Sequence, residues 1–408
     1  MRLKDIANIN PAYTGPDLGD QLVSFSPMEC LRYDSLKPIT ISFSEAKGKY
    51  TFFKDNDILF AKVTPCFENQ NIAIANNLVN GIGFGSSEIN VLRLKSDASL
   101  RYMFYVICSN RFYNTGCSSM CGVGGLKRIN PRAVSTFEFT MPSLAEQEAI
   151  AAYLDKECEK IGRKIELLER KADAYSRLRR SLINRAVTRG LNPNVLLKPS
   201  TIEWVGDIPV HWTISRFAYF FAEHNISNKG VNHQNLLSLS FGKIIRKNID
   251  SCDGLLPASF ETYQIVEPGN IVFRFTDLQN DHKSLRVGLV NEEGIITSAY
   301  TCVQGNKETL PKFAFYMLHS YDIKKVFYKL GGGMRQSLNY RTIKDMKVVF
   351  PPIEEQKEIA AYLDEKCAKI DAILEKINTE VERLKELKRS LINEVVTGQR
   401  AIDTELHS

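Results

Sequence analysis

A long internal repeat constrains this chain more than any other feature of its sequence. Residues 146–161, EQEAIAAYLDKECEKI, return at 355–370 as EQKEIAAYLDEKCAKI, an offset of 209 residues. The same offset holds without a gap from RRSLINRAVT at 179–188 to KRSLINEVVT at 388–397. About 21 of the 47 positions from Pro142 to Thr188 are identical to their partners. The sequence therefore predicts two copies of one structural unit in a single chain.

Each copy of the repeat has the apolar spacing of a long helix. Apolar side chains recur at steps of four and three residues, which is typical of a coiled-coil seam. Ser143 and Glu146 form a capping-box signal, and Gly190 marks the end of the first helix. We predict helices at 143–190 and 352–398. Each helix by itself would expose its apolar stripe to solvent, so we expect the two helices to pair with each other. The predicted helix-pair seam consists of Ile150, Leu154, Ile161, Ile165, Leu168, Leu182, Ile359, Leu363, Ile370, Leu374, Ile377 and Leu391.

Two globular segments alternate with the predicted helices. Residues 1–142 and 201–351 contain short β-rich runs such as ITISF, ILFAKV, INVLRL and FEFTM in the first, and LLSLSF, IVFRF and MKVVF in the second. A linker at 191–200 with two prolines separates the copies, and a tail follows at 399–408. Each globular segment also contains one aromatic-rich helical stretch, at 101–113 and 311–328. The fold class is therefore α+β, with two similar β-rich domains and two long helices.

Composition excludes several classes of protein. No run approaches the roughly 20 apolar residues that a bilayer span requires, and the start of the sequence lacks the apolar core of a signal peptide, so we expect a cytoplasmic protein. The nine cysteines are scattered and form no C-x-x-C pair, so neither a disulfide framework nor a zinc site is indicated. The net charge of +6 permits a polyanionic partner without requiring one.

Positive charge is concentrated in two places. Residues 162–190 and 324–347 are rich in arginine and lysine, and such clusters can neutralise phosphates. Glycine-rich loops lie at 121–132 (CGVGGLKRINPR) and 329–344 (KLGGGMRQSLNYRTIK). Glycine lets the backbone approach a ligand closely, and Arg, Lys, Gln and Asn are suited to base edges. Two similar domains suit a ligand that presents two binding sites at a fixed distance. DNA is such a ligand, because its half-sites lie at fixed spacings. The alternative explanation of the charge runs is a solvated helix face. The alternative explanation of the glycine-rich loops is a tight turn into the last strand.

Motifs for independent catalysis are absent from the sequence. The glycine run at 81–85 (GIGFG) leads into the strand-like EINVLRL and not into a helix. No Asn/Asp/Ser-Pro-Pro-Tyr/Phe segment is present to hold a flipped adenine, and no G-x-x-x-x-G-K-[ST] loop is present for ATP. The six histidines show no metal-ligand spacing. We expect a chain that is not itself an enzyme.

The sequence resembles the DNA-specificity subunits of type I restriction-modification systems over nearly its whole length. The resemblance rests on the duplicated P-x-x-x-E-Q-x-x-I-A-A-Y-L-D followed by R-S-L-I-N-x-x-V-T. It also rests on VSFSPMECL (23–31), TFFKDNDILFAKVTPCFENQNIAIA (51–75), NGIGFGSSEINVLR (80–93) and EWVGDIPVHW (203–212). One departure is that the first domain lacks the GDIPVHW segment that opens the second.

This resemblance implies a non-catalytic subunit that binds double-stranded DNA. Each globular segment would be a target-recognition domain that contacts one half of an asymmetric, interrupted site. The two helices would pair antiparallel, set the spacer between the half-sites and dock two methyltransferase subunits. The complex would methylate adenine with S-adenosylmethionine, and restriction translocase-nuclease subunits would add ATP- and Mg-dependent cleavage. No cofactor or metal is expected in this chain.

The resemblance also indicates which loops would face DNA. In the first domain the matching residues are Lys62, Thr64, Cys66, Glu68, Asn69, Ser86, Ser87, Glu88, Lys127 and Arg128. In the second domain the candidates are Arg274, Asp277, Gln279, Asn280, Met334, Arg335, Gln336 and Ser337. The alternative function is a non-enzymatic coiled-coil adaptor whose two domains bind proteins.

Overall fold

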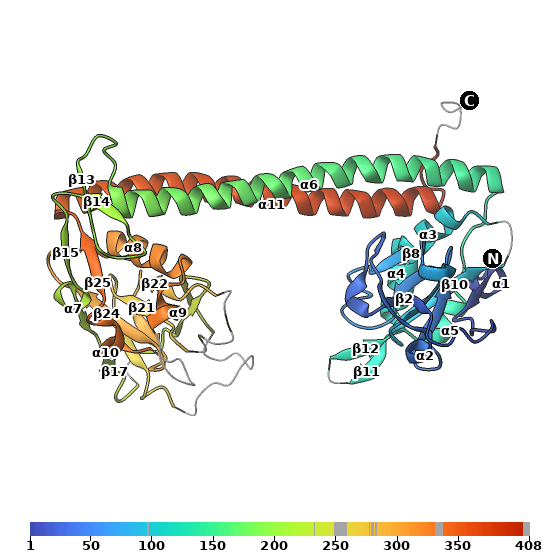
Figure 1. The fold of residues 1–408 in the computed structure, drawn as a ribbon, viewed down its shortest axis with the longest axis horizontal. Coiled ribbons are helices and arrows are strands. Elements are labelled where there is room, and N and C mark those ends of the chain that lie inside the picture. The colour runs from blue at the N-terminus through green and yellow to red at the C-terminus, as the bar shows by residue number, and fades with distance from the viewer. Residues whose placement is uncertain are drawn as a thin grey trace. The chain divides into compact units, whose positions relative to one another are not determined.

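The computed structural model describes residues 1–95, 98–123, 125–231, 233–248, 259–276, 278, 281, 284–330 and 338–402. The chain forms two compact units (Figure 1). Unit 1 consists of Met1–Glu169 and Asn378–Ser408, and unit 2 consists of Arg170–Ile377. Each unit therefore holds one β-rich domain together with parts of both long helices.

The two long helices are α6 (Leu144–Arg189) and α11 (Ile353–Val396). Within unit 1, Leu154 of α6 and Leu391 of α11 share one hydrophobic core, and Lys164 forms a salt bridge with Glu380 over 3.0 Å. Within unit 2, Ile183 of α6 and Leu363 of α11 share another core. In each unit the beginning of one helix packs against the end of the other, so the predicted antiparallel pair is confirmed (Figure 1).

The residues predicted for the seam are buried to different degrees. One group is buried: Leu154, Ile359, Leu363, Ile370, Ile377 and Leu391. A second group is half-buried: Ile150, Ile161, Ile165, Leu168, Leu182 and Leu374. The second group lies mostly on α6.

Unit 1 is built on two four-stranded sheets. The first has the order β1-β10-β7-β8 and is antiparallel throughout. The second has the order β5-β2-β9-β6, with β2 and β9 parallel. The elements are α1 (Leu3–Ile6), β1 (Ala7–Ile9), β2 (Leu22–Ser26), η1 (Met28–Cys30), β3 (Leu31–Arg32), β4 (Ser35–Leu36), β5 (Ile39–Ser42), α2 (Phe43–Ala46), β6 (Thr51–Lys54), β7 (Ile58–Ala61), β8 (Ile72–Ile74), η2 (Val79–Gly81), β9 (Ile82–Gly85), β10 (Ile89–Leu94), α3 (Leu100–Cys108), α4 (Asn110–Ser118), β11 (Cys121–Val123), β12 (Leu126–Arg128) and α5 (Pro131–Ser135).

Unit 2 repeats the main sheet of unit 1. Its antiparallel sheet has the order β16-β24-β21-β22, which matches β1-β10-β7-β8 position by position. The elements are β13 (Leu197–Pro199), β14 (Asp207–Pro209), β15 (Thr213–Arg216), α7 (Phe217–Phe220), β16 (Phe221–Glu223), β17 (Ile226–Ser227), β18 (Leu237–Ser240), β19 (Lys243–Arg246), β20 (Gln264–Val266), β21 (Ile271–Phe273), β22 (Val287–Leu289), β23 (Gly294–Ile296), β24 (Thr301–Gly305), α8 (Pro311–Ile323), α9 (Val326–Leu330), α10 (Tyr340–Ile343) and β25 (Lys347–Phe350). The duplication therefore extends from the helices into the domains.

The aromatic-rich stretches each form two helices and not one. Ser109 ends α3 and caps α4, because its hydroxyl accepts a hydrogen bond from the Phe112 amide. Lys325 has a φ of 59° between α8 and α9, which interrupts that helix. The predicted strand FEFTM also does not form a strand, and its residue Glu138 makes only an isolated bridge with Arg2.

The first residues of the first domain are equivalent to residues around Phe217 of the second domain, which follow its GDIPVHW segment. The Leu3 amide donates to the Phe137 carbonyl over 2.9 Å, just as the Phe217 amide donates to the Met346 carbonyl over 2.8 Å. The short helices α1 and α7 follow directly and bury their apolar side chains in the two cores. The GDIPVHW segment of the second domain therefore precedes the shared part of the fold.

A buried glutamine docks each domain onto its long helix. The Ser99 amide at the start of α3 donates to Gln147 Oε1 over 2.9 Å, and Gln147 Nε2 donates to the Pro142 carbonyl over 2.9 Å. The repeat places Gln356 in the same role. It accepts from the Leu310 amide over 2.8 Å and donates to the Pro351 carbonyl over 2.9 Å. These glutamines satisfy backbone groups that burial would otherwise leave unpaired.

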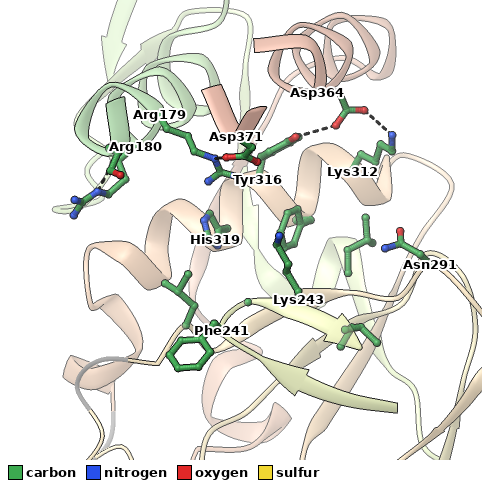
Figure 2. Close-up of a pocket in the computed structure, with 16 residues that line it drawn as sticks. Arg179, Arg180, Phe241, Lys243, Asn291, Lys312, Tyr316, His319, Asp364 and Asp371 are labelled. Atoms are coloured by element: carbon green, nitrogen blue, oxygen red, sulfur yellow. Dashed lines mark hydrogen bonds and ion pairs between the residues drawn. The ribbon is translucent and has the colours of Figure 1, made fainter. Parts of the chain in front are cut away.

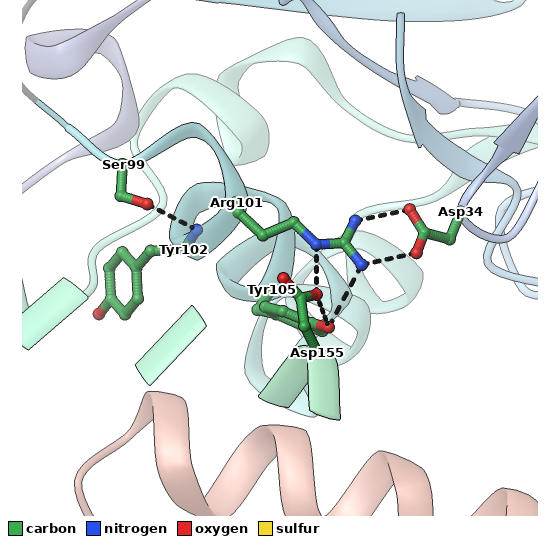
Figure 3. A network of polar contacts seen from close by, with 6 residues as sticks. All are labelled: Asp34, Ser99, Arg101, Tyr102, Tyr105 and Asp155. Atoms are coloured by element: carbon green, nitrogen blue, oxygen red, sulfur yellow. Dashed lines mark hydrogen bonds and ion pairs between the residues drawn. The ribbon is translucent and has the colours of Figure 1, made fainter. Parts of the chain in front are cut away.

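An ionic contact beside each glutamine completes this docking. In unit 1, Asp155 of α6 accepts from Arg101 Nε and from the Tyr105 hydroxyl, both over 2.6 Å (Figure 3). The two terminal nitrogens of Arg101 also donate to the two carboxylate oxygens of Asp34, each over 2.6 Å (Figure 3). In unit 2, Asp364 of α11 accepts from Lys312 over 2.5 Å and from the Tyr316 hydroxyl over 2.8 Å (Figure 2). We call these equivalent contacts, with their glutamines, the docking clasps.

Within the described part of the chain, no helix is both long and apolar enough to span a membrane. The eight cysteines described are free thiols. The same described residues contain no cluster of three or more His, Cys, Asp or Glu side chains with the spacing of a metal site.

Candidate nucleic-acid interface

Three segments that are distant in sequence converge in unit 1. The β7–β8 loop contains Lys62 and Thr64, the β9–β10 loop contains Glu88, and β12 contains Lys127 and Arg128. The Lys62 amide donates to the Glu88 carbonyl, and the Thr64 amide donates to the Lys127 carbonyl, each over 2.9 Å. The structure thus brings together the three groups of residues that the sequence predicted for the first domain.

Glu88 and Arg128 form an ion pair at the centre of this surface. Arg128 Nη2 lies 2.7 Å from Glu88 Oε1, and Arg128 Nε lies 2.9 Å from Glu88 Oε2. The hydrogen bonds from Arg128 hold the pKa of the Glu88 carboxyl below its usual value. The guanidinium is therefore oriented by a carboxylate and still presents N–H groups to solvent, an arrangement suited to a guanine edge.

The predicted residues of unit 1 differ in exposure. Asn69, Ser87, Lys127 and Arg128 are exposed, whereas Lys62, Thr64, Cys66, Glu68, Ser86 and Glu88 are half-buried. Within the β7–β8 loop, Phe67 stacks on Tyr113 of α4 with ring centroids 5.8 Å apart. This aromatic contact helps to fix the loop that carries the predicted polar residues.

In unit 2 the structure describes one of the predicted DNA-facing residues, Arg274, which follows β21. The other candidates lie outside the described residues: Asp277, Gln279, Asn280, Met334, Arg335, Gln336 and Ser337. Arg274 is half-buried, and its backbone amide donates to the Arg286 carbonyl over 2.9 Å. The position of the β21–β22 loop matches that of the β7–β8 loop in unit 1.

A fully buried arginine supports this loop, and the sequence did not single it out. The Arg286 guanidinium donates to the carbonyls of Arg274, Thr276 and Asp281 over 3.2, 2.5 and 2.5 Å. Arg286 Nε also donates to the Tyr328 hydroxyl over 3.2 Å. Five N–H groups in a fixed plane suit a cluster of carbonyl acceptors. Arg286 therefore holds the described residues at both sides of the loop.

Acidic partners neutralise part of the basic run on α6. Glu159 pairs with Arg163, Glu380 with Lys164, Asp173 with Arg177, and Asp371 with Arg179. Lys171, Arg185 and Arg189 are exposed and form no salt bridge with a described residue. About half of the cations in this run therefore belong to ion pairs of the helix surface, and phosphate binding by the others stays a prediction.

A cavity of about 680 Å³ lies beside the docking clasp of unit 2 (Figure 2). It is lined by residues of α8, of the β18–β19 hairpin and of the long helices α6 and α11. His319 lines it, and burial together with the nearby Arg179 charge lowers the pKa of His319 to about 4. Unit 1 has a matching cavity of about 770 Å³ beside Arg101 and Asp155. None of the predicted DNA-contacting residues lines either cavity, so these hollows belong to the docking region.

A duplicated α+β fold, in which polar loops converge on one surface of unit 1, is typical of a protein with two related binding modules. A family model, the type I restriction modification DNA specificity domain, matches residues 1–171 and 287–383. The chain belongs to this family, which confirms the resemblance seen in the sequence.

Individual relatives are similar over parts of the chain. The type I restriction enzyme EcoEI specificity subunit of Escherichia coli is 36% identical over 160 residues, which are 38% of this chain and 27% of that protein. The EcoAI specificity subunit of Escherichia coli is 38% identical over 152 residues, which are 36% of this chain and 26% of that protein. The matches thus span about a quarter of the length of these relatives.

A solved structure shares the fold over nearly the full chain. It comes from a study of complex assembly and conformational transition of the type I R-M system. The TM-score is 0.71 at 15% identity, with 98% of this chain and 97% of that chain covered. This likeness supports the two-domain, two-helix fold.

Proposed function

We propose that this chain is the DNA-specificity subunit of a type I restriction-modification complex and has no catalytic activity of its own. Residues 1–142 and 201–351 are its target-recognition domains, and each contacts one half of an asymmetric bipartite DNA site. Helices 143–190 and 352–398 set the spacer between the half-sites, and the segments 191–200 and 399–408 are linker and tail. The observation that carries the proposal is the convergence of the β7–β8 loop, the β9–β10 loop and β12 on one polar surface of a family member.

The catalytic chemistry belongs to partner subunits. Two methyltransferase subunits dock on the helix pair and bring S-adenosylmethionine, while translocase-nuclease subunits bring ATP and Mg. In this chain the docking clasps fix each domain on its helices, so a bound half-site has a defined orientation toward a docked subunit. Because the two domains share a sheet order but differ in their loops, the two half-sites differ in sequence.

The test is genome-wide mapping of adenine methylation in cells that carry this chain together with its methyltransferase subunit. We expect a new bipartite motif with an unspecified spacer, present only when both proteins are expressed. A palindromic motif would contradict the claim of two different half-sites. If the complex assembles and no motif appears, the protein-binding adaptor is the better explanation.

Salt dependence separates the same two functions in vitro. If the chain binds DNA through phosphate contacts, the affinity of the complex falls steeply as the salt concentration rises. An adaptor that binds an apolar protein surface responds little to salt. We expect the steep dependence, measured by fluorescence anisotropy on a duplex containing the mapped motif.

A further inference from the structure

The hairpin β11–β12 presents large apolar side chains to solvent. Val123 is 89% exposed and Leu126 is 48% exposed, and the two residues are direct partners in the β ladder. Directly opposed residues of an antiparallel pair project from the same face. Val123 and Leu126 therefore form one small apolar patch near the tip of the hairpin, and every described residue of both strands is exposed.

The base of the hairpin is fixed to the candidate DNA interface. The Thr64 amide donates to the Lys127 carbonyl over 2.9 Å, and Val63 forms a bridge with Arg128. The hairpin extends outward from these anchors (Figure 1). Its apolar patch thus projects beyond the surface on which Lys62, Lys127 and Arg128 lie.

At one position the hairpin backbone leaves no room for a side chain, because Gly122 has a φ of 153°. A Cβ on Gly122 would lie 2.2 Å from the Leu126 carbonyl oxygen and 2.9 Å from Lys127 Cα, so no other residue fits there. A two-stranded ribbon is one of the elements that the major groove of DNA admits.

Charge and polarity identify the partner of this hairpin. The cations at its base suit phosphates, and the apolar patch needs an apolar group at the far end. In the major groove the one apolar group on a base edge is the C5-methyl of thymine. A protein surface would satisfy the apolar patch, but it would give no role to the exposed Lys127 beside the patch.

We propose that the β11–β12 hairpin enters the major groove of the first half-site and that Val123 and Leu126 contact a thymine methyl group. The proposal rests on the DNA-binding function proposed above and adds a base-specific contact to it. Lys127 and Arg128 contact the flanking backbone and base edges, and the apolar patch supplies discrimination between thymine and other bases at one position.

Replacement of thymine by uracil tests this contact, because uracil lacks the methyl group and keeps the base pairing. Each thymine of the mapped first half-site is replaced in turn, and binding of the assembled complex is measured. With the natural chain we expect one replacement to weaken binding about three- to fivefold, as loss of one buried methyl group predicts. The double variant Val123→Ser, Leu126→Ser should bind both duplexes equally.

Lys127→Ala is the matched control, because it removes a charge from the same strand. It should weaken binding to all duplexes, reduce the salt dependence and retain the uracil effect. Thermal unfolding of the variants should match that of the natural chain, since all three altered side chains are exposed.

Three outcomes would overturn the proposal: no effect of uracil at any position, an unchanged uracil effect in the double variant, or a first half-site without thymine. Loss of methyltransferase binding by the double variant in the absence of DNA would instead assign the patch to a protein contact. Failure of the proposed function itself is recognised separately, because no methylation motif would then exist.

Discussion

The guanidinium of Arg286 lies in the interior of unit 2 and donates mainly to backbone carbonyls. Three of these carbonyls belong to residues on both sides of the predicted DNA-facing loop, at Arg274, Thr276 and Asp281. A buried acceptor that loses its donor costs about 1–3 kcal/mol. The side chain of Arg286 therefore links the stability of unit 2 to the shape of its loop.

Replacement of Arg286 by methionine should affect stability and recognition together. We expect the free energy of unfolding of unit 2 to fall by roughly 3 kcal/mol or more. The second half of the methylation motif should become less specific, while the first half is retained. Both tryptophans, Trp204 and Trp212, lie in unit 2, so urea denaturation followed by tryptophan fluorescence measures this unit.

The matched control for Arg286 is Arg246→Gln in the same unit. Arg246 pairs with Glu292 on the surface, and such pairs contribute less than about 1 kcal/mol. Equal losses in the two variants would show that Arg286 has no special supporting role.

His319 should make unit 2 sensitive to acid. Its pKa is lowered to about 4 in the folded protein, whereas an unfolded histidine has a pKa of about 6.5. Between these values the unfolded state binds more protons, so stability falls as the pH falls from about 6.5 to 4. The loss approaches roughly 3 kcal/mol, since one pKa unit corresponds to about 1.4 kcal/mol.

The His319→Phe variant isolates this effect, because it keeps a ring beside Phe315 and cannot titrate. We expect the natural chain to lose stability relative to the variant over this pH range, measured by tryptophan fluorescence in urea. The comparison also cancels the opposite effect of Asp322, whose burial raises its pKa to about 6. Parallel stability curves for the two proteins would contradict the prediction.

At the scale of elements, the docking clasps connect each domain to the helix pair. Gln356 is buried and joins the start of α8 to the start of α11, and Gln147 does the same for α3 and α6. Replacement of Gln356 by alanine leaves the Leu310 amide and the Pro351 carbonyl without this partner. We expect unit 2 to lose about 1–3 kcal/mol of stability.

The neighbouring Glu358→Ala is the control for Gln356→Ala, because Glu358 is exposed on the same helix. It should change the free energy of unfolding by less than about 0.5 kcal/mol.

For Gln147→Ala in unit 1, amide hydrogen exchange is the measurement, and protection should decrease first at the start of α3. Unchanged exchange there would show that the clasp is redundant.

Sequence periodicity located the long elements well and the short ones less well. The predicted helices 143–190 and 352–398 agree with α6 and α11 to within a few residues, because many apolar steps define them. FEFTM has the composition of a strand, but its pairing with the first residues of the chain is limited to one isolated bridge, Glu138 with Arg2. The aromatic stretch at 101–113 divides at Ser109, where a local capping bond competes with helix continuation.

The candidate site was predicted in part. The family resemblance identified the three groups of residues that meet in unit 1, while local sequence patterns contain no information on their mutual contacts. Arg286 could not be predicted, because its role depends on carbonyls that only the folded loop assembles. The exposed Val123 and Leu126 were also missed, since an apolar pair in a short strand usually indicates a core position.

At the scale of the whole molecule, the helices provide a direct test of spacer control. We propose removing residues 167–173 from α6 and 374–380 from α11, one heptad from each helix of the antiparallel pair. Seven helical residues correspond to roughly 10 Å, or about three base pairs at 3.4 Å each. We expect the spacer of the methylation motif to shorten by about this amount and both half-sites to persist.

Removal of the heptad from one helix alone is the control. It shifts the apolar stripe of that helix against an unchanged partner, so assembly of the pair should be impaired and the motif should disappear. Altered half-site sequences in the matched double deletion would show that the helices do more than set a distance.

The division of α6 and α11 between the units affects the order in which the protein matures on the ribosome. Unit 2 is one continuous stretch, Arg170–Ile377, whereas unit 1 combines Met1–Glu169 with residues that follow Ile377. The first-made domain therefore waits for a late helix, whose Leu391 and Val395 fill its core. We therefore expect the second-made domain to be complete first during synthesis, with the apolar face of the early helix uncovered until α11 has been made.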